Sequence, residues 1–288
     1  MQQDILSRLS GGTHKFSKGQ RAISAYITES YDKAAFMTAA ALGKAVGVSE
    51  STVVRFAMEL GYEGYPDLQK AMQEMVVNRL TAVQRIEVAN DRIGNQDVLS
   101  MVLQSDMEKL RQTAETVSRE DFRKAVDAIL SARRVFILGV RSTAPLANFL
   151  GYYLGQMLDN VQTVTTSGTS AVFEQIISAD RQDAVVAFSF PRYSTSTAQG
   201  AEYCRSKGAT VIGITDSMAS PLGRSCDHVL LAKSDMISLV DSLTAPLSIA
   251  NALIVAIAAR RERELEQKFS ELERVWERYN VYEKQGGL

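Results

Sequence analysis

Two loops of the sequence combine hydroxyl side chains with an arginine, and these residue types bind anions. The loops span residues 139–143 and 189–197. Hydroxyls donate hydrogen bonds to phosphate or carboxylate oxygens, and a guanidinium adds a fixed charge with bidentate geometry. The candidate anion-binding residues are Arg141, Ser142, Thr143, Ser189, Arg192, Tyr193, Ser194 and Thr195. In the alternative interpretation, both arginines face solvent and the hydroxyls only cap helices.

Metal and nucleophilic chemistry have few candidate residues. The chain has two cysteines, Cys204 and Cys226, and two histidines, His14 and His228. They form neither a CxxC pair nor a His-rich ligand set, so we expect no metal site and no cofactor. Isomerisation of a sugar would need a positioned base, and no carboxylate directly follows either loop. We therefore expect no catalytic residue and no enzyme.

Both loops follow short apolar runs that are expected to be strands. Five such runs alternate with helical stretches, at 134–139, 161–165, 184–189, 210–215 and 228–232. Continuous hydrophobicity indicates strands buried on both faces, and intervening helices indicate right-handed crossovers in a parallel sheet. Ligands of such sheets bind beyond the carboxyl ends of the strands, where both loops lie. The sequence predicts a five-stranded α/β sandwich.

The N-terminal segment has the pattern of a helix-turn-helix. Apolar residues in 39–58 occupy the positions at which two crossing helices meet, while Gly43 and Gly47 suit a close contact and a tight turn. The second helix should end at Gly61. Caps are expected at Ser17, Thr38 and Ser49.

The start of the second helix carries side chains that can contact DNA. Hydroxyls reach base edges or phosphates, and an arginine can bind guanine. The candidate DNA-binding residues are Lys44, Ser49, Glu50, Ser51, Thr52 and Arg55. In the alternative interpretation, the hydroxyls only start the helix and Arg55 is a solvated side chain.

Composition limits the class of protein. A chain of 288 residues corresponds to about two domains at roughly 150 residues each. The net charge of −1 means that DNA binding depends on local placement of basic residues. The start lacks the apolar core of a secretory signal, and the apolar stretch 247–259 is too short to span a bilayer. We expect a cytoplasmic protein with no membrane partner.

The stretch 35–69 resembles the N-terminal domain of RpiR-type transcriptional regulators, through its segment VSESTVVRFAMELG and the aromatic-Gly-aromatic residues that follow. In that family, a sugar-isomerase (SIS) domain follows. Its phosphosugar-binding loops read G-x-G-x-S and S-x-S-G-x-[ST], and Gly139, Ser142, Ser189 and Ser194 match them. Arg141 replaces the second glycine of the first loop, while Pro191 and Arg192 replace the Ser-Gly of the second. These departures put the usual phosphate cradle in doubt and favour an anion held by side chains.

The C-terminal segment is a candidate for assembly. Residues 246–259 are apolar nearly all round and should be buried. Farther on, a heptad seam flanked by charges is formed by Leu265, Phe269, Leu272, Trp276 and Tyr279. The seam either joins two copies or lies on the linker of its own chain, against Leu103 and Leu110.

These patterns predict three parts: a helix-turn-helix domain at 1–80, a helical linker at 81–120, and an SIS-like effector-binding and oligomerisation domain at 121–288. The expected function is a transcriptional regulator that binds double-stranded operator DNA as a homodimer or homotetramer and senses an anionic sugar-like metabolite, either a phosphosugar or a sugar acid. Two alternatives remain, an SIS-type phosphosugar isomerase and a constitutive DNA-binding assembly protein without an effector.

Overall fold

The computed structural model describes residues 9, 16–77, 81–94, 97–166, 168–234 and 240–282. Contacts divide the chain into two compact units, the first formed mainly by residues up to 95 and the second by the residues that follow. Each unit is described by itself. Within the described ranges, no helix is both long and apolar enough to cross a membrane.

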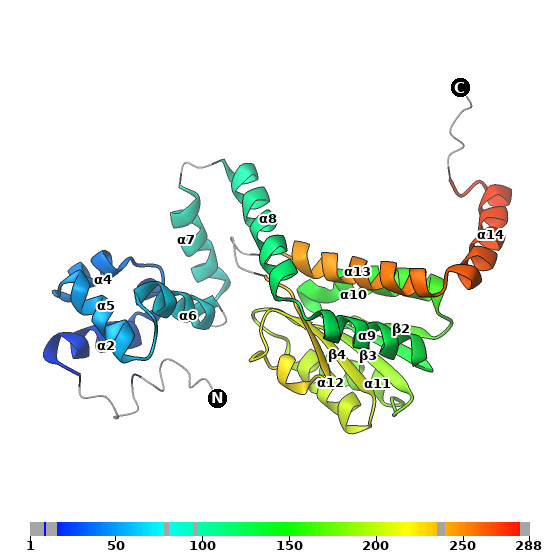
Figure 1. Ribbon diagram of the computed structural model, residues 1–288, viewed down its shortest axis with the longest axis horizontal. Helices are drawn as coiled ribbons and strands as arrows, with labels where there is room; N and C mark the ends of the chain where they lie inside the picture. The colour runs from blue at the N-terminus through cyan, green and yellow to red at the C-terminus, as the bar shows by residue number, and fades with distance from the viewer. Residues whose placement is uncertain are drawn as a thin grey trace. The chain divides into compact units, whose positions relative to one another are not determined.

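The N-terminal unit consists of helices (Figure 1). Its described helices are α2 (Lys18–Glu29), α3 (Tyr31–Ala34), α4 (Ala39–Val46), α5 (Glu50–Glu59), α6 (Tyr65–Val77) and α7 (Ala82–Ile93). Fully buried side chains from α2, α4, α5 and α6 form its core, among them Ile23, Leu42, Phe56 and Met72. The unit therefore packs one apolar stripe of each helix inward, as the sequence pattern predicts.

The turn between α4 and α5 confirms the expected helix-turn-helix geometry. Gly47 adopts a left-handed φ of 72° at the end of α4. A Cβ atom on Gly43 would lie 2.8 Å from the carbonyl oxygen of Val48, so this close approach requires glycine. Thr38 and Ser49 cap the two helices through the backbone N–H groups of Ala41 and Thr52. α5 ends at Glu59, just before the positive-φ Gly61.

The C-terminal unit contains a five-stranded parallel sheet in the order β2-β1-β3-β4-β5. The strands are β1 (Arg134–Leu138), β2 (Val161–Val164), β3 (Asp183–Phe188), β4 (Thr210–Thr215) and β5 (His228–Leu231). All five match the predicted apolar runs. The α/β sandwich expected from the sequence is confirmed, and the switch point of the sheet lies between β1 and β3.

Helices cover both faces of this sheet (Figure 1). α9 (Arg119–Ser131), α10 (Ala144–Met157) and α13 (Thr244–Arg260) share a core with Val135 and Ile137 of β1. α11 (Thr169–Ile176) and α12 (Thr195–Ser206) share a second core with Phe136 and Leu138. Neighbouring residues of β1 thus point to opposite faces, which explains its continuous hydrophobicity.

Two helices differ from the simple sequence picture. The linker region is divided into α7 and α8 (Val98–Thr116), and α7 ends at Ile93, just before Gly94 with its φ of 47°. The C-terminal helical stretch breaks at Arg261, so that α14 (Glu262–Tyr279) is separate from α13. No glycine or proline marks the second break, so the sequence pattern does not indicate it.

Candidate functional site

The two hydroxyl-rich loops lie side by side at the carboxyl edge of the sheet, because β1 and β3 are adjacent parallel strands. The Thr143 hydroxyl connects the two loops by hydrogen bonds. Its oxygen lies 2.9 Å from the carbonyl oxygen of Val140 and 3.3 Å from that of Phe188, and the residue is 5% exposed. Thr143 therefore supports the shape of the site, and its hydroxyl is already engaged.

Arg141 and Arg192 occupy left-handed backbone conformations. Their φ angles are 57° and 62°, which L residues adopt at a cost of about 1–2 kcal/mol each. Both side chains are exposed, and neither forms a hydrogen bond or ion pair with another described residue. The loops thus keep a backbone conformation suited to glycine while adding two unpaired cations.

Two buried hydroxyls lie where β3 passes into α12. Ser189 is 2% exposed and Thr197 is 0% exposed, and neither Ser189 Oγ nor Thr197 Oγ1 has a hydrogen-bond partner among the described residues. A buried hydroxyl without a partner is costly. Ser194 makes no side-chain hydrogen bond to the N-terminus of α12, so the first-turn N–H groups there are uncapped. This strand-to-helix junction has the donors that an anion needs.

The second loop is tied to the neighbouring strand by an aromatic hydroxyl. Tyr193 donates to both carboxylate oxygens of Asp216, at 2.9 Å and 3.0 Å. Asp216 directly follows β4, and Thr215 Oγ1 also donates to it at 3.2 Å. Three strand ends are therefore joined at this edge.

The structure distributes the predicted anion-binding residues in different roles. Ser142 and Thr195 are exposed at the start of the two helices, while Ser194 is half-buried and bonded to Ser196 Oγ at 2.8 Å. Sequence reasoning placed Thr197 at the end of the second loop but did not single it out as a binding residue. Its position in the first turn of α12 was the available signal.

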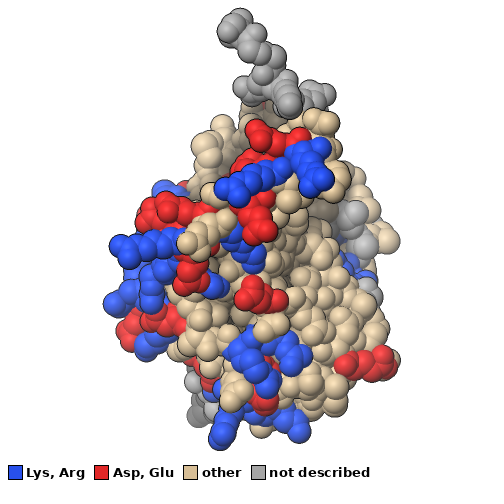
Figure 2. All heavy atoms as spheres, turned by 90° about the vertical axis from the view of Figure 1, so that its right-hand side faces the viewer, with Lys and Arg blue, Asp and Glu red and all other residues tan. Residues whose placement is uncertain are grey.

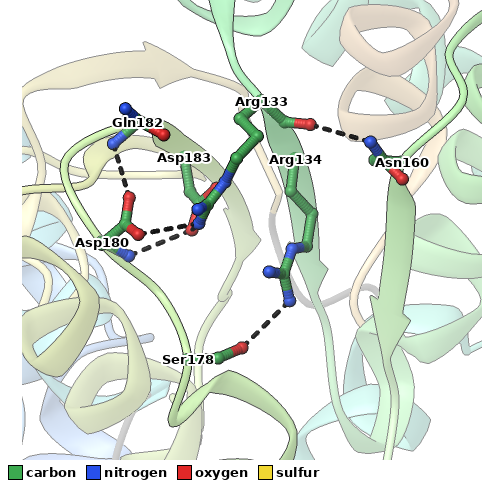
Figure 3. Close-up of polar contacts among 7 residues, drawn as sticks. All are labelled: Arg133, Arg134, Asn160, Ser178, Asp180, Gln182 and Asp183. Atoms are coloured by element: carbon green, nitrogen blue, oxygen red, sulfur yellow. Dashed lines mark hydrogen bonds and ion pairs between the residues drawn. The ribbon is translucent and has the colours of Figure 1, made fainter.

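A hollow of about 450 Å³ lies at the opposite, amino edge of the sheet, bordered by Arg133, Asn160 and Arg261. Its charged groups already have partners, some of them within the lining, as Arg261 has in Glu264, and others outside it. Arg133 binds Asp183 and Asp180, each at 2.9 Å or less, and Figure 3 shows this cluster with Arg134 and Ser178. Because these groups are already satisfied, we favour the carboxyl edge as the binding site.

Removing the buried carboxylate at the amino edge should destabilise the fold and spare the carboxyl edge. Asp183 is 2% exposed and accepts hydrogen bonds from Arg133 and from the backbone of Asp180. Asp183→Ala should lower the free energy of unfolding by about 1–3 kcal/mol, measured by urea denaturation. Asp180→Ala, at the half-buried partner carboxylate, should cost clearly less. An equal loss in both variants would contradict the role of burial.

The cysteines are unreactive. Burial raises the pKa of the Cys204 thiol and that of the Cys226 thiol to about 12, so both stay protonated near neutral pH. The described part of the chain also contains no group of three or more His, Cys, Asp or Glu residues arranged to hold a metal ion.

In the N-terminal unit, the predicted DNA-contacting residues start α5. Ser49 Oγ lies 2.9 Å from Ser51 Oγ and 2.8 Å from Thr52 Oγ1, so the three hydroxyls form one cluster around the cap. Arg55, one turn later, is exposed, and its Nε donates to the carbonyl of Ser51. Glu50 on α5 and Lys44 on α4 are exposed as well.

Comparison with known proteins decides the family. A model of the helix-turn-helix domain of the rpiR family matches residues 3–79, and a model of the SIS domain matches residues 128–256. The chain belongs to the RpiR-type transcriptional regulators. Curated relatives of this RpiR-type chain include HexR of Pseudomonas aeruginosa, 22% identical over 90% of both chains, and an uncharacterized HTH-type regulator of Clostridium perfringens, 24% identical over 78% of this chain and 80% of the relative. These relatives are named transcriptional regulators rather than enzymes.

Solved structures agree with the fold of an RpiR-type regulator. The sugar isomerase domain of an RpiR transcription factor from Sphaerobacter thermophilus is 27% identical, with a TM-score of 0.59 over 62% of this chain and 99% of that domain. The NanR protein of Vibrio vulnificus, complexed with ManNAc-6P, is 20% identical, with a TM-score of 0.59 over 97% of this chain and 100% of that chain. The second likeness shows the fold alone.

Substitutions on the two helices of the RpiR-type domain should separate base reading from phosphate binding. Arg55→Ala should cost about 1–3 kcal/mol of operator binding and relax specificity at one base pair. Lys44→Ala should weaken binding to all sequences and reduce its salt dependence. Fluorescence anisotropy with operator and scrambled duplexes checks both. If operator affinity is unchanged in both variants, α5 is not the recognition helix.

Proposed function

We propose that this regulator senses an anionic sugar-like metabolite, a phosphosugar or a sugar acid, at the carboxyl edge of its SIS domain. The main support is the pair of buried hydroxyls without partners, Ser189 and Thr197, beside the uncapped N-terminus of α12. Such a junction favours an anion through the helix dipole and through free N–H groups. Arg141 and Arg192 add positive charge at the entrance.

α12 is a better anion site than α10. The first turn of α10 contains Pro145, which lacks an N–H donor, and Thr143 does not cap it. The first turn of α12 keeps all its donors and contributes the hydroxyls of Ser196 and Thr197. We therefore place the phosphate or carboxylate of the metabolite at α12 and the rest of the sugar toward the loop 139–143.

A phosphorylated sugar is the first ligand class to test. NanR of Vibrio vulnificus shares this fold and was solved with ManNAc-6P. The G-x-G-x-S and S-x-S-G-x-[ST] positions that match the family's phosphosugar loops lie at this edge. Sugar acids form the second class, because a guanidinium binds carboxylates as well as phosphates.

Thermal shift of the purified chain against sugar phosphates and sugar acids tests the proposal. A ligand present at 100 times its Kd should stabilise the protein by about 2.7 kcal/mol. The double variant Ser142→Ala with Ser189→Ala should lose this shift and keep its DNA affinity. Ser178→Ala, at the amino edge and bonded to Arg134, is the matched control and should respond like the wild type.

The two alternatives make different predictions. An isomerase would convert an aldose phosphate to a ketose phosphate, which a coupled turnover assay detects. The nearby Asp216 carboxylate is held by the Tyr193 hydroxyl, an arrangement that favours a structural role over that of a base. A constitutive DNA-binding protein would show no shift with any anion, and its DNA affinity would not change.

We propose further that α14 joins two copies. A single helix-turn-helix contacts few bases, and symmetric half-sites need a two-fold partner. Figure 2 shows charged side chains of both signs on the face of the molecule that it draws, and α14 leaves Val275 and Tyr279 exposed.

The charges beside the seam bear on the orientation of the two helices. In a parallel pair, heptad spacing places Lys268 opposite Glu273 of the other copy, whereas an antiparallel pair would bring Glu266 and Glu273 together. The charge pattern favours the parallel pair.

A further inference from the structure

The segment that leaves β5 is hydrogen-bonded to α8 at two places. The backbone N–H of Lys233 donates to Thr113 Oγ1 at 2.9 Å, and Thr113 is 4% exposed. Two turns earlier on α8, Asp106 accepts hydrogen bonds from Ser242 Oγ at 2.5 Å and from Thr244 Oγ1 at 2.8 Å. We call these three hydrogen bonds the α8 latch.

The α8 latch is connected to the carboxyl edge through the backbone. The N–H of Ala232, the residue before Lys233, donates to the carbonyl of Thr215 at 2.9 Å. Thr215 precedes Asp216, and Asp216 holds Tyr193 of the second anion-binding loop. Hydrogen bonds and the peptide bonds between them thus connect that loop, across the ends of β4 and β5, to α8.

The hydrogen bonds of this connection are costly to break because Thr113 and Ser234 are buried. Because Thr113 is buried, separating Lys233 from it would leave a backbone donor without a partner, at a substantial cost. Ser234, 3% exposed, adds a hydrogen bond to the carbonyl of Ser242 and so holds the two ends of the segment together. A displacement at the carboxyl edge would therefore be passed to α8 instead of being absorbed locally.

We infer that the α8 latch transmits occupancy of the carboxyl edge to α8, the first helix after the boundary between the two units. This inference rests on the proposed function, because it needs an anion to bind at α12. The latch deepens that proposal by naming the contacts through which binding would reach the linker. An effector then acts by favouring one arrangement of α8 over another.

Hydrogen–deuterium exchange of the full chain tests the latch. The probes are inorganic phosphate and the sugar phosphate or sugar acid with the largest thermal shift, each at saturation. In the wild type, both the first turn of α12 and the residues of α8 should change their exchange rate. Asp106→Ala should keep the α12 response and lose most of the α8 response. Thr113→Val, which is close in shape to the wild type, should do the same.

Control variants distinguish loss of the α8 exchange response from unfolding of the protein. Glu108→Gln changes an exposed carboxylate of α8 that pairs with Arg111, so its α8 response should equal that of the wild type. Asp106→Asn is a smaller change that replaces Asp106→Ala in the test if the alanine variant unfolds. The thermal midpoint of every variant is measured. If α8 responds equally in the wild type and in the latch variants, the latch is overturned and the proposed function stands. If α12 responds to neither probe in the wild type, both proposals fall.

Discussion

Replacing Arg141 and Arg192 by glycine should remove most of the effector affinity without harming the fold. Each arginine offers charge-assisted hydrogen bonds worth about 1.5–3 kcal/mol, so losing both should weaken binding by about 100-fold or more. Glycine adopts a positive φ without strain. At both positions, the free energy of unfolding should therefore stay level or rise by up to about 1 kcal/mol per site. Calorimetric titration and urea denaturation measure the two effects.

Related variants distinguish charge from geometry. Arg141→Lys with Arg192→Lys keeps the charge but loses the bidentate fork, and should retain part of the affinity. Alanine at both sites should lose affinity like glycine and gain no stability, because alanine also resists a positive φ. If the glycine variant binds the effector as tightly as the wild type, both arginines only face solvent.

Disrupting the half-buried seam residues Leu272 and Trp276 of α14 should convert the protein to a smaller species with weak operator binding. Leu272→Gln with Trp276→Gln replaces two apolar residues of the heptad seam, both later in α14 than the residues that pack on the core. Linking two DNA-binding modules raises avidity by about 100- to 10,000-fold, so most of that factor should disappear. Light scattering gives the mass, and anisotropy gives the operator affinity.

Point substitutions serve this test better than truncation does. Leu265 is 8% exposed and belongs to the core of the C-terminal unit, with Phe269 packed against it, so removing the tail would also damage the fold. Glu271→Gln with Arg274→Gln, on the exposed charged side, is the control and should keep the wild-type mass. An unchanged mass in the seam variant would overturn the proposal that α14 joins two copies.

The sequence predicted the sheet and the helix-turn-helix well because both have strong local signals. Strands buried on two faces leave continuous apolar runs, and Gly43, Gly47 and Ser49 each have one dominant physical reason for their position. The conformation of Arg141 was harder to predict, since residue type alone argues against a positive φ there. The surrounding loop overrides that preference.

Features that depend on distant segments left no sequence signal. The contact between Lys233 and Thr113 joins residues 120 positions apart, and no periodicity describes such a pair. The break at Arg261 lacks glycine and proline, and the side chain of Arg261 donates to the carbonyl of Met157, 104 positions earlier in the chain. The two candidate loops followed from the sequence pattern, but the buried hydroxyl of Thr197 without a partner required the structure.

The paired charges around Asp183 hold the amino edge of the sheet, while the candidate ligand groups lie at the carboxyl edge. The two edges can therefore change independently. A biosensor built on this chain can take stabilising substitutions near Arg133 and redesigned specificity at Arg141 and Arg192 in the same molecule. Sites this far apart in the sheet should combine additively, so that a library at one edge need not be repeated for each variant of the other.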